Sequence, residues 1–117
     1  VFGCNGDRDK EKRPVMGRIA GEFADHIIVT SDNPASEDPQ SIIDTVAAAV
    51  AEKTDAYETV LRRWDAIYYA ATLPKAGDVL VLAGKGHEKQ ETMKDENLYY
   101  NEWETAEEAV RRLKEGR

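Results

Sequence analysis

The sequence lacks several features that define common classes of protein. Its 117 residues include one cysteine, Cys4, so no disulfide framework can form and an intracellular setting is the simplest interpretation. No apolar run approaches the roughly 20 residues of a membrane-spanning helix, and no signal-peptide pattern opens the chain. The length fits one compact domain covering residues 1–117. We therefore expect a single domain that does not insert into a membrane.

Basic residues are also in the minority, since the net charge is −7. Nucleic-acid binding needs a basic face that neutralises phosphates, so we expect no nucleic-acid partner. One basic cluster, Arg8, Lys10, Lys12 and Arg13, is compatible both with a solvated loop and with a local anion pocket. Two histidines and one cysteine, widely separated, make a poor zinc site, so we expect no metal bound by this chain.

Two common nucleotide-binding motifs are missing. Neither G-x-x-x-x-G-K-[ST] nor G-x-G-x-x-G occurs in the chain. The sequence thus lacks the usual means of holding a nucleoside triphosphate on its own. Its apolar start, Val1-Phe2-Gly3, is typical of an entry strand that belongs to something longer.

Helical spacing of apolar residues predicts four helices. They begin near Pro14, at Asp38-Pro39, near Trp64 and at Asn101, where Asn101 with Glu104 resembles a capping box. The predicted buried faces are Val15, Met16, Ile19, Ala20 and Phe23; Ile42, Ile43, Val46, Ala47 and Val50; Trp64, Ile67, Tyr68 and Ala71; and Trp103, Ala106, Val110 and Leu113.

Short apolar runs between these helices predict strands at 26–30, 58–61 and 78–83, the last (DVLVLA) being the clearest. A charged stretch at 89–100 favours a hairpin. Alternation of strand and helix is typical of an α/β fold. We therefore expect a Rossmann-like, open, mostly parallel sheet with helices on both faces and an antiparallel hairpin near the C-terminus.

Ligand sites on such sheets lie beyond the carboxyl ends of the strands. That rule selects three loops, at residues 3–13, 31–38 and 84–88. In the first, Gly3 and Gly6 permit close backbone approach. Arg8 in the same loop is a planar double donor suited to a carboxylate.

The other two loops each allow a simple interpretation and a functional one. Spacing alone favours reading Asp32-Asn33-Pro34 as a strand-to-helix turn with Asp38 as the cap. The segment GKGHE is either a flexible turn or a backbone that approaches a ligand, with Glu88 poised for an ammonium group. A Cys4–His87 thiol–imidazole pair has no evident orienting partner, so it is not favoured.

Together, FGCNGDRDKEKRPVM, TSDNPASEDPQSII and VLAGKGHEKQ resemble the C-terminal domain of the UDP-N-acetylmuramoyl-tripeptide synthetases (MurE) of the Mur ligase family. The resemblance covers nearly the whole chain, with the motifs in the family's order. It implies a cytoplasmic bacterial enzyme in which upstream domains hold the UDP-sugar, the P-loop and magnesium. The C-terminal domain brings the incoming amino acid and closes over ATP.

The reaction implied by the resemblance is ATP-dependent amide formation. The D-glutamate carboxylate of UDP-MurNAc-L-Ala-D-Glu is activated as an acyl phosphate, and the amine of a diamino acid attacks it. ATP and Mg²⁺ would be bound mainly outside this chain, so the fragment alone is expected to be inactive and to contain no catalytic residue.

Residue by residue, the resemblance implies that Arg8 grips the amino acid's carboxylate and that Asn33 makes a second polar contact. Gly84 would offer a backbone contact, and Glu88 would receive the distal ammonium. Asp32 and Ala35 belong to the specificity loop. Asp7 and Lys12 lie where the family closes on ATP.

Ala35 departs from the family pattern. Members that use meso-diaminopimelate typically have Asp-Asn-Pro-Arg, and that arginine pairs with the substrate's second carboxylate. L-Lysine has no second carboxylate, whereas diaminopimelate would bury a charge without its partner. The sequence therefore favours L-lysine, although another basic residue such as Arg18 could compensate.

Two other functions stay open. The chain could be a free-standing, non-catalytic binding module for a small acidic or zwitterionic ligand. It could also belong to another Mur-family ligase, such as the folate-chain ligase, although the DNP and GKGHE motifs count against that.

Overall fold

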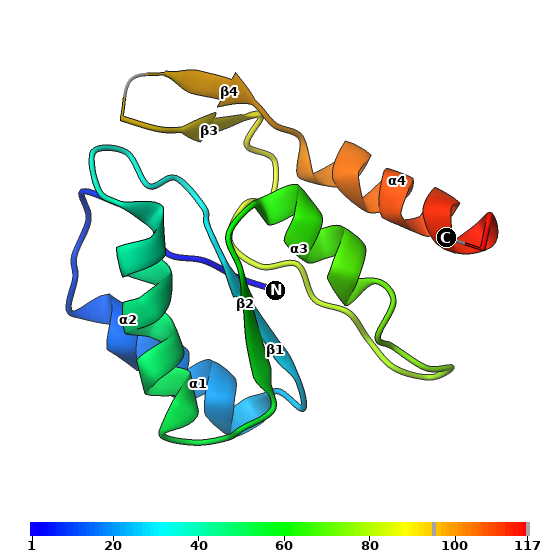
Figure 1. Ribbon diagram of the computed structural model, residues 1–117, viewed down its shortest axis with the longest axis horizontal. Helices are drawn as coiled ribbons and strands as arrows, with labels where there is room; N and C mark the ends of the chain where they lie inside the picture. The colour runs from blue at the N-terminus through cyan, green and yellow to red at the C-terminus, as the bar shows by residue number, and fades with distance from the viewer. Residues whose placement is uncertain (95, 117) are drawn as a thin grey trace.

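The structure, a computed structural model that describes residues 1–94 and 96–116, is built around two parallel strands. Strands β1 (Ile27–Thr30) and β2 (Tyr57–Val60) pair with Ile27 opposite Tyr57. Helices α1 (Lys12–Phe23) and α2 (Pro39–Ala51) lie on one side of them. Helices α3 (Arg63–Ala70) and α4 (Glu102–Lys114) lie on the other (Figure 1). The predicted α/β fold, with a parallel sheet and helices on both faces, is confirmed.

The first residues of the chain extend the sheet beside β1. Phe2 forms an isolated parallel bridge with Val29. The Phe2 amide donates to Ile28 O (3.1 Å), and the Thr30 amide donates to Phe2 O (2.9 Å). The polypeptide therefore leaves the sheet at Gly3, at the same end of the sheet at which β1 ends.

The segment 78–83, predicted as the clearest strand, is not one. It makes two backbone hydrogen bonds to Val1, from the Val1 amino group to Val81 O and from the Ala83 amide to Val1 O, both 2.9 Å. Its apolar side chains are not buried, and Val79 is 84% exposed. A buried strand needs neighbours along a whole ladder. Among the described residues, only Val1 pairs with this segment in the way that a neighbouring strand would.

The core confirms the predictions for β1 and α2. Every residue of β1 is buried, as its uninterrupted apolar run indicates. Ile27 and Val29 pack against α2, while Ile28 faces the opposite way, toward α3. The five predicted apolar residues of α2 are all buried. Asp38 is the residue before the helix, as predicted, but its carboxylate accepts from the Ser41 hydroxyl rather than from a backbone amide.

The predicted apolar face of α1 is wrong, because the helix buries its glycines instead. Gly17 and Gly21 lie against α2, and a β-carbon at Gly17 would be 2.6 Å from Val46 O. Residues four apart lie on one face of a helix, so these glycines form a groove that admits the neighbouring backbone. The apolar stripe then points outward, and Phe23 is 78% exposed.

Helix α4 begins as predicted and buries a different face. Asn101 Oδ1 accepts from the Glu104 amide (3.0 Å), which confirms the cap. Trp103, part of the predicted apolar face, is 73% exposed, whereas Thr105 and Ala109 are buried. The helix packs on α3, where the small Ala109 permits close contact beside Tyr100.

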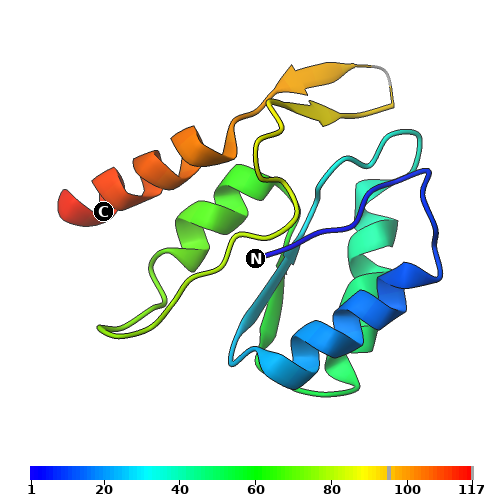
Figure 2. The same ribbon diagram turned by 180° about the vertical axis from the view of Figure 1, so that it is seen from behind.

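A hairpin lies beyond the carboxyl ends of β1 and β2 (Figure 2). Strands β3 (Gln90–Thr92) and β4 (Asn97–Tyr99) are antiparallel, which confirms the prediction for this stretch. The Ala35 amide donates to Thr92 O (2.9 Å), so the hairpin is tied to the loop after β1. The hairpin therefore covers the end of the sheet at which the strands have their carboxyl ends, the end that the topological rule selects.

Candidate functional site

The three loops converge in space, as the topological rule predicts. The Gly6 amide donates to Asn33 O (2.7 Å), which joins the loop before α1 to the loop after β1. Asn33 Nδ2 donates to Glu88 Oε2 (2.9 Å), which joins the loop after β1 to residues 84–88. Segments far apart in the sequence thus form one surface at the end of the sheet.

A cleft of about 530 Å³ opens on this surface. Arg8, Gly84 and Asp32, three of the predicted site residues, line it, together with Lys12 from the predicted ATP group. The other lining residues are Gly3, Cys4, Asn5, Asp9, Arg13 and Met16. The side chains of Arg8 and Lys12 have no hydrogen-bond or ion-pair partner within residues 1–94 and 96–116. They lie at or just before the N-terminus of α1, where a helix favours an anion. This part of the cleft fits a carboxylate or a phosphate.

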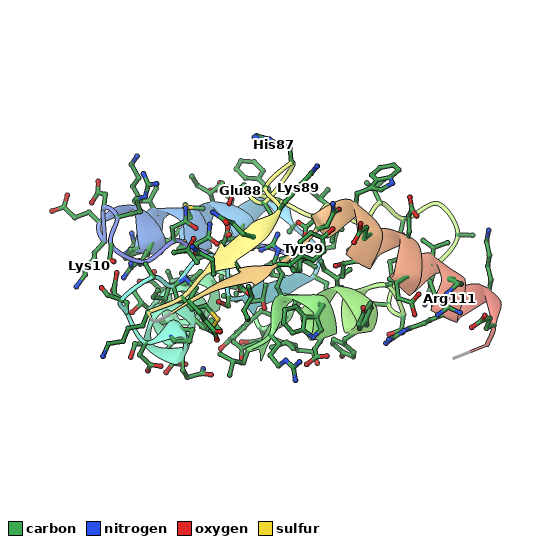
Figure 3. The ribbon with its side chains drawn as sticks, turned by 90° about the horizontal axis from the view of Figure 1, so that it is seen from above. Lys10, His87, Glu88, Lys89, Tyr99 and Arg111 are labelled. Carbon is green, nitrogen blue, oxygen red and sulfur yellow. The ribbon has the colours of Figure 1, made fainter. Side chains whose placement is uncertain are left out.

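The remaining predicted residues lie beside the cleft rather than in its lining. Asn33 and Glu88 are bonded to each other, and Glu88 is half-buried at the base of the hairpin (Figure 3). Asp7 has a positive φ of 55°, and its carboxylate accepts from the Ser36 hydroxyl and amide. It therefore ties two loops together. Ala35 also has a positive φ, of 51°, and forms a bridge with Met93.

Arg13 holds the loop before α1 and the loop after β1 together. Its guanidinium makes two hydrogen bonds to Glu37, at 3.0 and 2.7 Å, and a third to Asn5 O at 2.9 Å. The Arg13 hydrogen bond holds the pKa of the Glu37 carboxyl well below its usual range, at about 2. Two members of the basic cluster are thus accounted for, because Lys10 also approaches Glu37 (3.8 Å). Arg8 and Lys12 are left to face the cleft.

A thiol–imidazole pair is ruled out by the positions of its two members. Cys4 is buried, its thiol donates to Met16 Sδ (3.6 Å), and burial raises its pKa to about 11. His87 is exposed at the outer end of its loop (Figure 3). A protonated thiol is a weak nucleophile. Within the described ranges no group of three or more His, Cys, Asp or Glu side chains could hold a metal ion.

Buried charges behind the loops were missed by the sequence analysis. Lys85 and Arg63 are both fully buried, and each bonds to a carboxylate that is distant in sequence, Asp32 and Glu102 respectively. Arg63 also donates to Ala83 O (3.0 Å), directly before the GKGHE loop. Only the tripeptide Gly84-Lys85-Gly86 gave a local signal, and it did not indicate burial.

Glu91, on β3, is a buried carboxyl whose pKa is raised, because loss of solvation outweighs the nearby Lys85 charge. A raised pKa stabilises the fold below the ordinary value of 4.5, and this contribution is lost as the pH rises through the raised value. At neutral pH, Glu91→Gln is therefore expected to raise the free energy of unfolding, because the neutral amide avoids the cost of burying a charge.

Urea unfolding at pH 4 and pH 7 measures this effect. The gain is expected at pH 7 and should shrink at pH 4. Glu107→Gln, at an exposed glutamate of α4, is the control and should change little at either pH. A Glu91→Gln variant that is less stable than the wild type at pH 7 would contradict the prediction.

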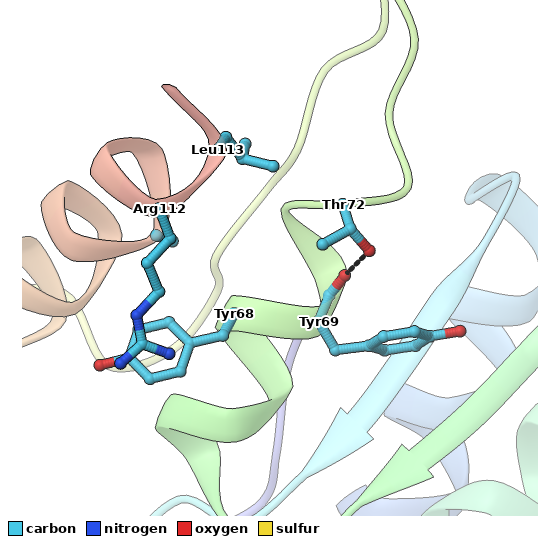
Figure 4. Close-up of a pocket in the computed structure, with 6 residues that line it drawn as sticks. Tyr68, Tyr69, Thr72, Arg112 and Leu113 are labelled. Carbon is cyan, nitrogen blue, oxygen red and sulfur yellow. Dashed lines mark hydrogen bonds between the residues drawn. The ribbon is translucent and has the colours of Figure 1, made fainter. Parts of the chain in front are cut away.

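A second hollow, of about 450 Å³, lies between α3 and α4, away from the three loops. The Arg112 guanidinium is 3.8 Å from the centre of the Tyr68 ring, and Thr72 Oγ1 donates to Tyr69 O (Figure 4). The Arg112 cation is already stacked on the Tyr68 ring, so we interpret this hollow as the packing surface between α3 and α4 and not as a ligand site.

No helix among the described residues is long and apolar enough to cross a membrane.

Fold and site together define an α/β domain that offers a small ligand a cationic cleft at the end of a parallel sheet. Residues 1–86 match the family described as "Mur ligase, glutamate ligase domain". The chain belongs to the Mur ligase family, and it matches that family's C-terminal domain.

Two relatives and one solved structure that are similar to the chain carry the same name. The UDP-N-acetylmuramoyl-L-alanyl-D-glutamate--2,6-diaminopimelate ligase of Clostridium tetani is 47% identical over 113 residues, covering 97% of this chain and 23% of that protein. The protein of the same name from Alkaliphilus oremlandii is 45% identical over 112 residues, covering 96% and 23%. A solved structure with that name has a TM-score of 0.85 at 35% identity, covering 97% of this chain and 23% of its own. The chain thus spans about a quarter of the length of these relatives.

Proposed function

We propose that residues 1–117 are the amino-acid-binding, C-terminal domain of an ATP-dependent, amide-forming ligase of peptidoglycan precursor synthesis. The substrate would be UDP-MurNAc-L-Ala-D-Glu, and the amino acid added would be a diamino acid. The convergence of three loops around a cationic cleft carries the proposal. The names of the relatives support it.

In the proposed reaction, ATP activates the D-glutamate carboxylate as an acyl phosphate, and the amine of the diamino acid attacks it. The products are the amide, ADP and phosphate. Arg8 would bind the α-carboxylate of the diamino acid, and Glu88 would accept its distal ammonium. Gly84 would offer its backbone, and Asn33 would hold Glu88 in place. Positioning of this kind makes the attack effectively intramolecular.

ATP and Mg²⁺ would be held mainly by other domains of the ligase. Within the described residues the cleft offers cations but no carboxylate cluster. Lys12 would contact a phosphate of ATP when the domain closes. Asp7 would keep the first loop in position through its hydrogen bonds with Ser36. By itself the domain would bind amino acid weakly and hydrolyse no ATP. A single, free cysteine suits a reducing compartment, which supports a location of the proposed ligase in the bacterial cytoplasm.

L-Lysine is the amino acid that Ala35 supports. A methyl side chain gives no partner to a second carboxylate, so diaminopimelate would leave a charge unpaired there. Arg18 is a poor substitute, because its Nε is bonded to Glu52 (2.8 Å), directly after the end of α2. Ala35 lies before the other end of α2, whose 13 residues span about 20 Å.

Diaminopimelate is the second candidate, and the names of the relatives favour it. A chimaera distinguishes the two candidates. The C-terminal 23% of the Clostridium tetani ligase is replaced by this chain, to which it is 47% identical. Amide formation with UDP-MurNAc-L-Ala-D-Glu is then compared for L-lysine and meso-diaminopimelate. Higher kcat/KM with lysine is expected, and higher kcat/KM with diaminopimelate would overturn the preference.

Ala35→Arg in this chimaera is expected to shift kcat/KM toward diaminopimelate by about tenfold or more, because a guanidinium pairs well with a carboxylate. Ala35→Leu is the matched control, since it adds bulk at the same positive φ without charge. An equal shift from both variants would show that size rather than charge acts at this position.

The same chimaera addresses the other interpretations. A chimaera that folds and binds amino acid, but forms no amide with any diamino acid, would favour a non-catalytic binding module. Amide formation on a folate substrate instead would favour another Mur-family ligase. The relatives' names count against the latter.

A further inference from the structure

Lys85 lies fully buried where the second and third loops meet, and the proposed reaction gives it no role. Its Nζ donates to Asn33 Oδ1 (2.7 Å) and to Asp32 Oδ1 (3.2 Å). It is also 3.9 Å from Glu88 Oε2 and 5.4 Å from the centre of the Tyr100 ring. A lysine ammonium is seldom buried without a task, because loss of solvation is costly.

The contacts of Lys85 fix the orientation of the Asn33 amide. Its oxygen accepts from two groups that can only donate, the Lys85 ammonium and the Thr92 amide (2.9 Å). The nitrogen must then face the other way, where it donates to Glu88 Oε2. A flipped amide would set donors against donors on one side and two acceptors against each other on the other side.

This network leaves one oxygen of Glu88 available. Oε2 is engaged by Asn33 and faces the Lys85 charge, whereas Oε1 has no hydrogen-bond partner among the described residues. The charges around Lys85 also favour one more cation. Asp32, Glu88 and the nearby Glu91 are acidic and Lys85 is basic, so this group attracts an ammonium to Oε1.

We propose that Lys85 is a positioning residue, which orients Asn33 and Glu88 so that Glu88 Oε1 accepts the distal ammonium of the amino acid. This inference rests on the proposed function, because it assumes an amino acid with a distal amine. A merely structural alternative exists, in which Lys85 only neutralises the buried Asp32. The two differ in what the removal of Lys85 does to recognition of the distal amine.

Two probes separate these roles. L-Lysine carries the distal ammonium, and L-norleucine has the same chain length without it. Both are titrated into the ¹⁵N-labelled 117-residue chain, and dissociation constants are taken from backbone amide shifts. The wild type is expected to bind lysine about tenfold more tightly than norleucine, as is typical of one charge-assisted hydrogen bond.

Lys85→Met is expected to reduce this ratio to about one while norleucine binding changes less than about twofold. Lys89→Met, at an exposed lysine next to Glu88, is the matched control and should keep the wild-type ratio. If Lys85→Met does not fold, Asp32→Asn with Lys85→Met removes both members of the buried pair, so that no charge stays unpaired. The double variant should also lose the ratio.

A folded Lys85 variant that keeps the tenfold ratio would overturn the positioning role. Equal weakening of lysine and norleucine would do the same, since it would show a structural role only. Failure of the proposed function looks different, because the wild type itself would then bind both probes equally or bind neither.

Discussion

Replacing Arg63 with methionine is expected to lower the free energy of unfolding by about 3–5 kcal/mol. Arg63 is fully buried, and its guanidinium bonds to both oxygens of Glu102, at 3.0 and 2.7 Å. Methionine fills similar space but leaves the Glu102 carboxylate buried without its cation. Such a loss is a large part of the 5–15 kcal/mol that is typical of a folded domain.

The effect should reach beyond the ion pair itself. Glu102 also accepts from the Tyr100 hydroxyl, and Arg63 donates to Ala83 O, so the pair joins α3, α4 and the start of the GKGHE loop. The Arg63 partner lowers the pKa of the Glu102 carboxyl despite its burial, which would otherwise raise it. Without Arg63 that carboxyl should take up a proton at a higher pH.

Urea unfolding at neutral pH measures the loss, and the neighbouring Arg62 provides the control. Arg62 is exposed and lies 3.7 Å from Asp65, so Arg62→Met should cost less than about 1 kcal/mol. Adding Glu102→Met to Arg63→Met should restore part of the stability, because the buried charge is then gone. Equal losses from Arg62→Met and Arg63→Met would show that the buried pair contributes nothing special.

Local patterns were sufficient to predict the parts of the fold that depend on one segment. The apolar run of β1 and the helical spacing in α2 predict burial, because β1 lies between Phe2 and β2 in the sheet and α2 packs against β1. Asn101 caps α4 through a contact three residues away, which is also visible in the sequence. The hairpin follows from charge and spacing in one short stretch.

Faces that depend on a partner could not be predicted in this way. Gly17 and Gly21 are buried because the backbone of α2 fits against them, and no property of α1 alone reveals that fit. The outward apolar stripe of α1 was therefore assigned to the core. The segment 78–83 reads as a strand, yet a strand also needs neighbours, and its side chains are largely exposed.

The candidate site also contains features that could be predicted from the sequence and features that depend on distant partners. The first two loops follow segments that pair in the parallel sheet, so their position at the end of the sheet was predictable from topology. The third loop was selected because 78–83 was predicted as a strand, and it reaches the same place through the hydrogen bonds that Asn33 makes with Glu88 and Lys85. Lys85 and Arg63 were not predictable, since each acquires its role from a carboxylate 53 or 39 residues away in the sequence. Asp32 was assigned to a specificity loop by resemblance, and the structure adds that its carboxylate faces Lys85.

Gly6→Ala is expected to weaken binding of L-lysine to the chain by about tenfold to 100-fold, because separating the two loops removes a charge-assisted hydrogen bond worth about 1.5–3 kcal/mol. A β-carbon at position 6 would lie 1.7 Å from Pro34 O and 2.5 Å from Pro34 C. Both are backbone atoms, so no side-chain rotation relieves the clash. The loop that carries Arg8 and the loop that carries Asn33 must separate.

Separation would also break the hydrogen bond from the Gly6 amide to Asn33 O, which at 2.7 Å is one of the direct links between these loops. The core between β1 and α2 lies elsewhere, so the fold should persist with a loss of about 1–3 kcal/mol. Amide exchange at residue 6 should become fast, and the lysine titration should no longer saturate at concentrations that saturate the wild type.

Gly77→Ala separates this effect from a general loss of stability. Gly77 has a φ of +94° with open space around it, so alanine is strained there by about 1–2 kcal/mol without touching the loops. The two variants should lose comparable stability, and only Gly6→Ala should lose lysine binding and protection of the residue 6 amide. Wild-type affinity in a folded Gly6→Ala variant would mean that close contact between the first two loops is not needed to form the site.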